Sequence, residues 1–167
     1  YANSNSVEKS IESQKLALEN FILVNHIQFI TNSYLNLSNY FIQFELYDSA
    51  LVYLNMAKQR LVQEHDSYGL IKAYSNYGTI YKYLGNSDSS YSAYYKAIKI
   101  LNDEPEAIFM RSHTKISTYA SVADAYFQFD QLDSAKKYID LSINMADSVQ
   151  ISAGLDNIVN IASLVYE

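Results

Sequence analysis

The sequence has no cysteine, one proline and only four glycines among its 167 residues. Without cysteine the chain can form no disulfide, no cysteine-ligated zinc site and no thiol nucleophile. Scarce glycine and proline argue against a sheet-rich fold, because short strands need turn residues between them. The composition instead favours long helices joined by short loops.

Positive charge and long apolar runs are also scarce. Twelve basic residues are scattered among 18 acidic ones, and the formal net charge is −6. Binding to phosphate requires clustered lysine and arginine, so we expect this segment to contact neither nucleic acid nor an anionic membrane surface. No apolar run reaches the length of a membrane-spanning helix. The start lacks methionine and the end falls inside an apolar periodic stretch, so we expect a piece of a longer protein.

Three segments of the sequence share one spacing of large and small residues. Each begins with tyrosine, which is followed at three, four and seven positions by a large, a small and a large residue. The segments are Tyr34-x2-Leu37-Ser38-x2-Phe41, Tyr74-x2-Tyr77-Gly78-x2-Tyr81 and Tyr119-x2-Val122-Ala123-x2-Tyr126. A second small residue follows the first by twelve positions, at Ala50, Ser90 and Ala135. Spacings of three, four and seven place residues on one helix face, so the pattern predicts repeated pairs of closely packed helices.

This pattern resembles the tetratricopeptide repeat, W-x2-L-G-x2-Y followed by spaced small residues. The resemblance implies an all-α fold of antiparallel helix pairs, stacked as a right-handed superhelix whose first helices line a concave groove. Tyrosine replaces the usual tryptophan, the closing proline is missing, and the units begin 40 and then 45 residues apart (74 − 34 and 119 − 74). The prediction is a single array over 1–167, with units at about 31–64, 71–104 and 116–149 and partial units at about 1–20 and 153–167.

Local signals predict where the helices begin and end. Asp-Ser pairs at Asp48, Asp88 and Asp133 predict capped starts of the second helices. Gly85 predicts a left-handed helix end, and Pro105 predicts the first turn of a helix. The expected helices are about 6–19, 22–44, 48–64, 67–84, 88–102, 104–129, 133–149 and 153–166.

Residues of the first helices that fall off the buried stripe are predicted to face the groove and bind a partner. Asparagine and glutamine among them carry paired donors and acceptors, which suit an extended peptide backbone. The predicted partner-binding residues are Asn32, Asn36, Asn39, Gln43, Lys72, Asn76, Thr79, Lys82, Tyr83, Ser121, Asp124 and Gln128. The function predicted is therefore a scaffold for a protein or peptide.

An alternative function is a receptor for a small ligand such as a glycan. The sequence has 17 tyrosines, and Tyr83, Tyr91 and Tyr95 fall off the repeat core. This alternative requires a closed aromatic pocket. No cofactor, metal site or enzymatic activity is predicted, because the sequence has no phosphate-binding glycine loop and its three histidines lack metal-ligand spacing.

Two further expectations concern the larger context. The long units and the Asp-Ser-Ala helix starts are similar to those in the repeat regions of Bacteroidetes sensor and transcriptional regulators, which implies a signalling segment that is cytoplasmic or, in a membrane-bound regulator, periplasmic. Repeat arrays need polar caps at their ends. We therefore expect self-association through apolar faces of the terminal helices, at Val7, Ile11, Leu18, Ile158, Ile161 and Val165.

Overall fold

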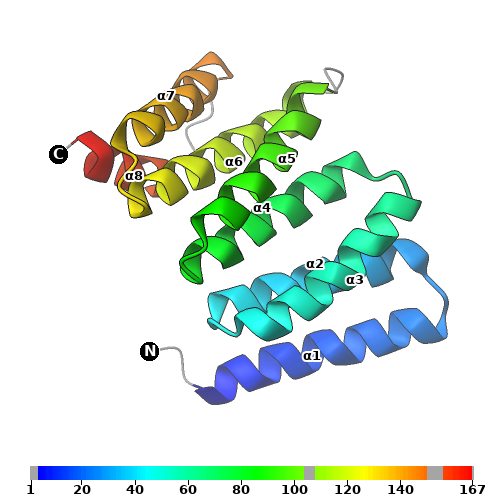
Figure 1. Ribbon diagram of the computed structural model, residues 1–167. Coiled ribbons are helices and arrows are strands. Elements are labelled where there is room, and N and C mark those ends of the chain that lie inside the picture. Colours follow the sequence, from blue (N-terminus) through cyan, green and yellow to red (C-terminus); the bar gives the residue numbers. More distant parts are fainter. Residues whose placement is uncertain (1–3, 104–107, 150–155, 167) are drawn as a thin grey trace. The chain divides into compact units, whose positions relative to one another are not determined.

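The computed structural model describes residues 4–103, 108–149 and 156–166. Within these ranges every element is an α-helix (Figure 1). The helices are α1 (Ser4–Leu23), α2 (Ile27–Gln43), α3 (Tyr47–Gln63), α4 (Ser67–Tyr83), α5 (Ser87–Asp103), α6 (Ile108–Gln128), α7 (Leu132–Ser148) and α8 (Asp156–Tyr166). The predicted all-α class of antiparallel helix pairs is confirmed, and the described helices include none long and apolar enough to cross a bilayer.

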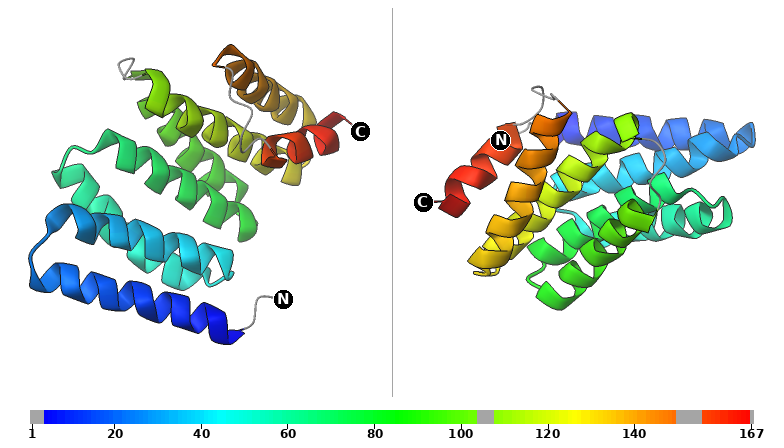
Figure 2. Two further views of the ribbon diagram at one scale, coloured as in Figure 1. Left: turned by 180° about the vertical axis from the view of Figure 1, so that it is seen from behind. Right: turned by 90° about the horizontal axis from the view of Figure 1, so that it is seen from above.

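The chain divides into two compact units, with the boundary inside α4. Unit 1 is Tyr1–Asn76 and unit 2 is Tyr77–Glu167. In unit 1, α1 packs on α2 and α2 packs on α3; in unit 2, α6 packs on α5, α7 and α8. The close pairs α2–α3 and α6–α7 are visible in both views of Figure 2. The superhelix predicted for the whole array involves both units together and stays a prediction.

One backbone turn recurs at the ends of five of the described helices. The residue after each helix end has a positive φ, between 51° and 73°, and these residues are Asn25, Glu45, His65, Gly85 and Asp130. The N–H of the residue that follows bonds back across the last helical turn, as in His26 to the Phe21 carbonyl at 2.9 Å. This is the hydrogen-bond pattern of the Schellman motif. The prediction for Gly85 is confirmed, whereas the four non-glycine positions were not predicted.

These turns also fix the spacing of the helices. Helices α2 to α5 begin at Ile27, Tyr47, Ser67 and Ser87, so the interval from one helix start to the next is constant. A pair of helices therefore repeats at the interval that separates Tyr34 from Tyr74, as the sequence spacing of the first two units indicates. The turn at residues 24–26 ends α1 at Leu23 and starts α2 at Ile27, so the predicted boundary near residue 20 is wrong.

The prediction that the Asp-Ser pairs cap the second helices is also wrong for α3 and α7. Their N-caps are Leu46 and Gln131, which form no side-chain cap bond, because the turn starts each helix earlier than predicted. Asp48 and Asp133 lie in the first helical turn, where a negative charge is stabilised by the helix dipole. Pro105 lies outside the described residues.

Side-chain caps occur instead at two positions that follow directly on the left-handed residues. The Asp66 carboxylate accepts a hydrogen bond from the Gly69 N–H at 2.9 Å at the start of α4. The Asn86 side-chain oxygen accepts one from the Ser89 N–H at 3.0 Å at the start of α5. The residue after the left-handed turn is thus the N-cap of the next helix.

The small residues of the repeat lie where two helices touch. A Cβ added to Gly78 would lie 2.6 Å from the ring of Tyr94, closer than packed atoms approach. The Ser90 hydroxyl donates a hydrogen bond to the Gly78 carbonyl at 2.9 Å. Ala50, Ala123 and Ala135 are fully buried in the other units. The predicted close contact between paired helices is therefore confirmed.

Buried serines at these contacts differ in how their hydroxyls are satisfied. The Ser142 hydroxyl donates to the Ile116 carbonyl at 2.9 Å, as Ser90 does to Gly78. Ser38 is also fully buried, but its hydroxyl oxygen has no hydrogen-bond partner. An unpaired buried hydroxyl destabilises the folded state relative to an alanine of the same shape.

The terminal helices do not expose the residues that the sequence predicted. Ile11 and Leu18 of α1 are 9% and 8% exposed, since α1 packs on α2. Ile158, Ile161 and Val165 of α8 are buried in a core cluster with residues of α6 and α7. The exposed apolar side chains of α8 are instead Val159, Leu164 and Tyr166. The side chain of Val7 lies outside the described residues, and self-association stays a prediction.

Candidate partner-binding surface

The predicted groove residues of unit 1 lie mainly on the exposed side of α2 and α4. Asn32, Asn36, Asn39, Gln43 and Lys72 are all exposed, and Asn76 is half-buried. The Asn76 side-chain nitrogen donates a hydrogen bond to the Asn39 side-chain oxygen at 2.7 Å. The two predicted asparagines thus meet between α2 and α4, and each keeps further hydrogen-bonding capacity.

A polar trough separates α1 from α2 in unit 1. It consists of two adjoining cavities of about 380 and 300 Å³ that share Gln14 and Tyr40. The larger cavity is also lined by Asn36, Asn39 and Gln43, and the smaller one by Lys9, Ser10 and Ser13. We call this feature the α1–α2 trough. It brings three predicted residues together with α1 residues that the sequence reasoning missed, because that reasoning assigned the groove to first helices alone.

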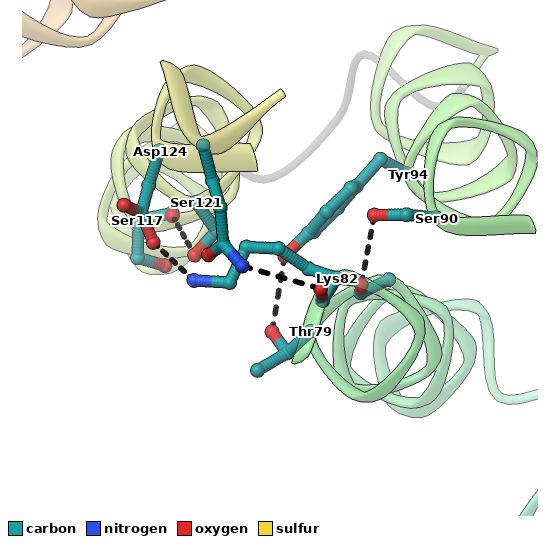
Figure 3. A network of polar contacts seen from close by, with 9 residues as sticks. Thr79, Lys82, Ser90, Tyr94, Ser117, Ser121 and Asp124 are labelled. Atoms are coloured by element: carbon teal, nitrogen blue, oxygen red, sulfur yellow. Dashed lines mark hydrogen bonds and ion pairs between the residues drawn. The ribbon is translucent and has the colours of Figure 1, made fainter. Parts of the chain in front are cut away.

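The predicted groove residues of unit 2 form bonds with one another (Figure 3). Lys82 of α4 is only 4% exposed, and its ammonium group forms an ion pair with Asp124 of α6. The same nitrogen lies 4.3 Å from the centre of the Tyr83 ring. The Gln128 side chain donates to the Lys82 backbone carbonyl at 3.4 Å. Lys82 therefore differs from the expected exposed groove lysine, because its charge is compensated within the fold.

Two other predicted residues of unit 2 take part in hydrogen bonds within the fold. The Thr79 hydroxyl lies 3.0 Å from the hydroxyl of Tyr94, which is 2% exposed. Desolvation by burial raises the pKa of Tyr94 well above its usual value, so the phenol stays neutral. The Ser121 hydroxyl donates to the Ser117 carbonyl at 2.9 Å in its own helix. The polar face of unit 2 is thus largely self-satisfied, in contrast to the α1–α2 trough.

The surplus tyrosines of unit 2 are partly used in packing. Tyr91 stacks on Tyr126 with ring centres 4.4 Å apart, and Tyr126 stacks on Tyr138 at 5.5 Å. Burial raises the pKa of the Tyr91 phenol, whose hydroxyl has no partner. Tyr83 and Tyr95 are 51% and 68% exposed. The aromatic side chains thus form a packed column through α5, α6 and α7 rather than the walls of the described cavities.

The comparison with protein families identifies one repeat. Residues 71–102 match the model of the tetratricopeptide repeat family. This range covers most of α4 and α5 and agrees with the second predicted unit, at about 71–104. No curated protein matches the chain. The chain therefore carries a tetratricopeptide-type helix pair, and repeats of this type generally mediate protein–protein interactions and typically act as non-catalytic scaffolds.

Proposed function

We propose that this chain is a scaffold that binds a protein or peptide partner through the exposed amides of unit 1. The observation that supports this function most directly is that Asn36, Asn39 and Gln43 line one cavity. Amide side chains both donate and accept hydrogen bonds, as an extended peptide backbone requires. A polar site of this kind fits a scaffold, since the cavity holds no acid–base pair or nucleophile with a base.

The proposal extends to the biological context of the chain. The long repeat units and the Asp-Ser-Ala motifs at the second helices support a segment of a bacterial sensor or transcriptional regulator. In such a protein the repeats would bind the partner and a separate domain would give the output. The scarcity of basic residues supports a role in which this segment itself contacts no nucleic acid.

Partner capture from the native cell tests the scaffold function. The Asn36→Ala/Gln43→Ala variant should fold normally, because both side chains are exposed, and should lose partner. Affinity should fall by about 1–3 kcal/mol if both side chains lose hydrogen bonds that are buried on binding. The matched control is Gln59→Ala/Asn102→Ala, which removes one glutamine and one asparagine from exposed positions of α3 and α5. An unchanged set of captured proteins for both variants would contradict the proposed function.

A further inference from the structure

The repeat register relates the trough to a contact that is already occupied in unit 2. Ser38 and Ala123 are equivalent small residues 85 positions apart (123 − 38), so Gln43 corresponds to Gln128 and Asn39 to Asp124. In unit 2 both of these α6 residues hold α4, since Asp124 pairs with Lys82 and Gln128 donates to a backbone carbonyl. This edge of a first helix therefore binds polypeptide, including its main chain.

The same part of α4 also packs on α5. The Ser90 hydroxyl bonds to the Gly78 carbonyl, and the Tyr94 ring lies against Gly78. In unit 2, α4 thus lies in the angle between a second helix, α5, and the following first helix, α6, as Figure 3 shows. By the repeat register α1 and α2 are the corresponding pair in unit 1. The α1–α2 trough is the equivalent angle.

The trough is too narrow for the helix that its counterpart takes. Gln14 is aligned with the fully buried Ala57, Ala97 and Ser142 of the later second helices. Tyr40 is aligned with Ala125, which is fully buried and packs in a cluster with Tyr94. These larger side chains occupy the space into which a helix of about 10 Å diameter would have to pack. Both also present hydrogen-bonding groups, so a thinner, extended chain suits the remaining space.

Charge defines one end of the trough. Its lining residues include no carboxylate, and the only charged side chain among them is Lys9. Lys9 is exposed and, in the ranges that the structure describes, makes no ion pair. The other end, at Asn36 and Gln43, is neutral. A ligand that matches this lining is uncharged and polar along its length and carries an acidic group beside Lys9.

We propose that the α1–α2 trough binds an extended peptide of uncharged polar residues, oriented by a carboxylate of the peptide beside Lys9. The inference rests on the proposed scaffold function and adds to it the place, the conformation and the charge of the ligand. It differs from the predicted concave groove because half of the site comes from α1. Gln43 and Asn39 would bond to the peptide backbone in the manner of their counterparts on α6.

Titration of the isotope-labelled chain with three defined peptides tests the proposal. The first is Asn-Gln-Ser-Asn-Gln-Ser-Asp with blocked ends, the second replaces its Asp by Lys, and the third is a helix-forming repeat of Glu-Ala-Ala-Ala-Lys. We expect the first peptide to shift amide resonances of α1 and α2. The Lys-ended peptide should bind at least about threefold more weakly, since it places a cation beside Lys9. The helical peptide should shift none of these resonances.

Two single substitutions and one control sharpen the test. Gln14→Ala should weaken binding of the first peptide by about 2–10-fold, as expected for one lost hydrogen bond. Lys9→Gln should abolish the preference for the Asp-ended over the Lys-ended peptide. Lys99→Gln, which changes an exposed lysine of α5, should preserve that preference. Amide spectra of the free variants check that each retains the fold.

Several outcomes would overturn the proposal. Shifts confined to α4 and α6 would place the site elsewhere and leave the scaffold function standing. Binding of the helical peptide in the trough, or of a second copy of the chain, would contradict the extended conformation. A failure of all three peptides to shift α1 or α2 at millimolar concentration would overturn the ligand assignment, whereas the scaffold function fails only through the capture experiment.

Discussion

The ring of Tyr94 lies directly over the backbone of Gly78, and the two helices that carry these residues touch at this point. The contact allows the Tyr94 hydroxyl to reach Thr79 and the Ser90 hydroxyl to reach the Gly78 carbonyl. Gly78→Ala should therefore destabilise the fold, by about 1–3 kcal/mol, because the new methyl group forces the rigid ring or the backbone to move. Thermal melts measure the loss, and Ser92→Ala on the exposed face of α5 is the control. Equal melting temperatures for both variants would contradict the repeat register.

The buried serines make a paired prediction. Ser38→Ala should leave stability unchanged or raise it by up to about 1 kcal/mol, because it removes a buried hydroxyl without a partner. Ser90→Ala should lower stability by about 1 kcal/mol, because it leaves the Gly78 carbonyl without this bond. Chemical denaturation of the two variants measures the difference. A larger loss for Ser38→Ala than for Ser90→Ala would refute this assignment of hydrogen bonds.

The left-handed turns predict stabilising substitutions. His65 has a φ of 53°, a conformation that costs a side-chain-bearing residue about 1 kcal/mol relative to glycine. His65→Gly should therefore raise the free energy of unfolding by up to about 1 kcal/mol, and Gly85→Ala should lower it by a similar amount. The control is His113→Gly, since the same change inside α6 should destabilise by about 1 kcal/mol. If His65→Gly destabilises as His113→Gly does, the turn assignment is wrong.

The ion pair of unit 2 should respond unequally to the loss of each partner. The Lys82 side chain is 5% exposed and the Asp124 side chain is 36% exposed. Asp124→Asn leaves a buried ammonium group without its counterion and should cost about 1–3 kcal/mol, between the values typical of exposed and buried pairs. Lys82→Met should cost less, since the remaining carboxylate can reach water. Urea denaturation of the two variants checks this order, and a reversed order would count against the burial of Lys82.

The parts of the structure that follow from side-chain size could be predicted from the sequence. Gly78 and Ala135 recur at fixed spacing because two backbones approach closely there, and that requirement leaves a periodic trace. Gly85 was predictable for a similar reason, since glycine is the usual residue in a left-handed turn. Asn25, Glu45 and Asp130 adopt the same turn without that trace, so the boundary between α1 and α2 was misplaced.

The candidate site was predicted less completely because its properties depend on residues distant in the chain. Lys82 belongs to the exposed positions by helix spacing, but its exposure is decided by Asp124, 42 residues later. Gln14 belongs to a second helix, and only its larger size relative to Ala57 and Ala97 indicates a different role. The cavity beside Asn36 and Gln43 depends on that substitution.

The constant spacing of the turns makes the array modular in length. The segment 47–86 comprises one second helix, one first helix and their turns, which is one full period of the repeat. Excising it would join Leu46, the N-cap of α3, directly to Ser87, the first residue of α5, and leave a first helix followed by a second one. Excising only the first half of the segment, 47–66, would place two first helices in succession and bring together faces that do not match. Natural shortening or lengthening of such a chain should therefore proceed in steps of two helices, and a designer can change the size of the scaffold by the same step.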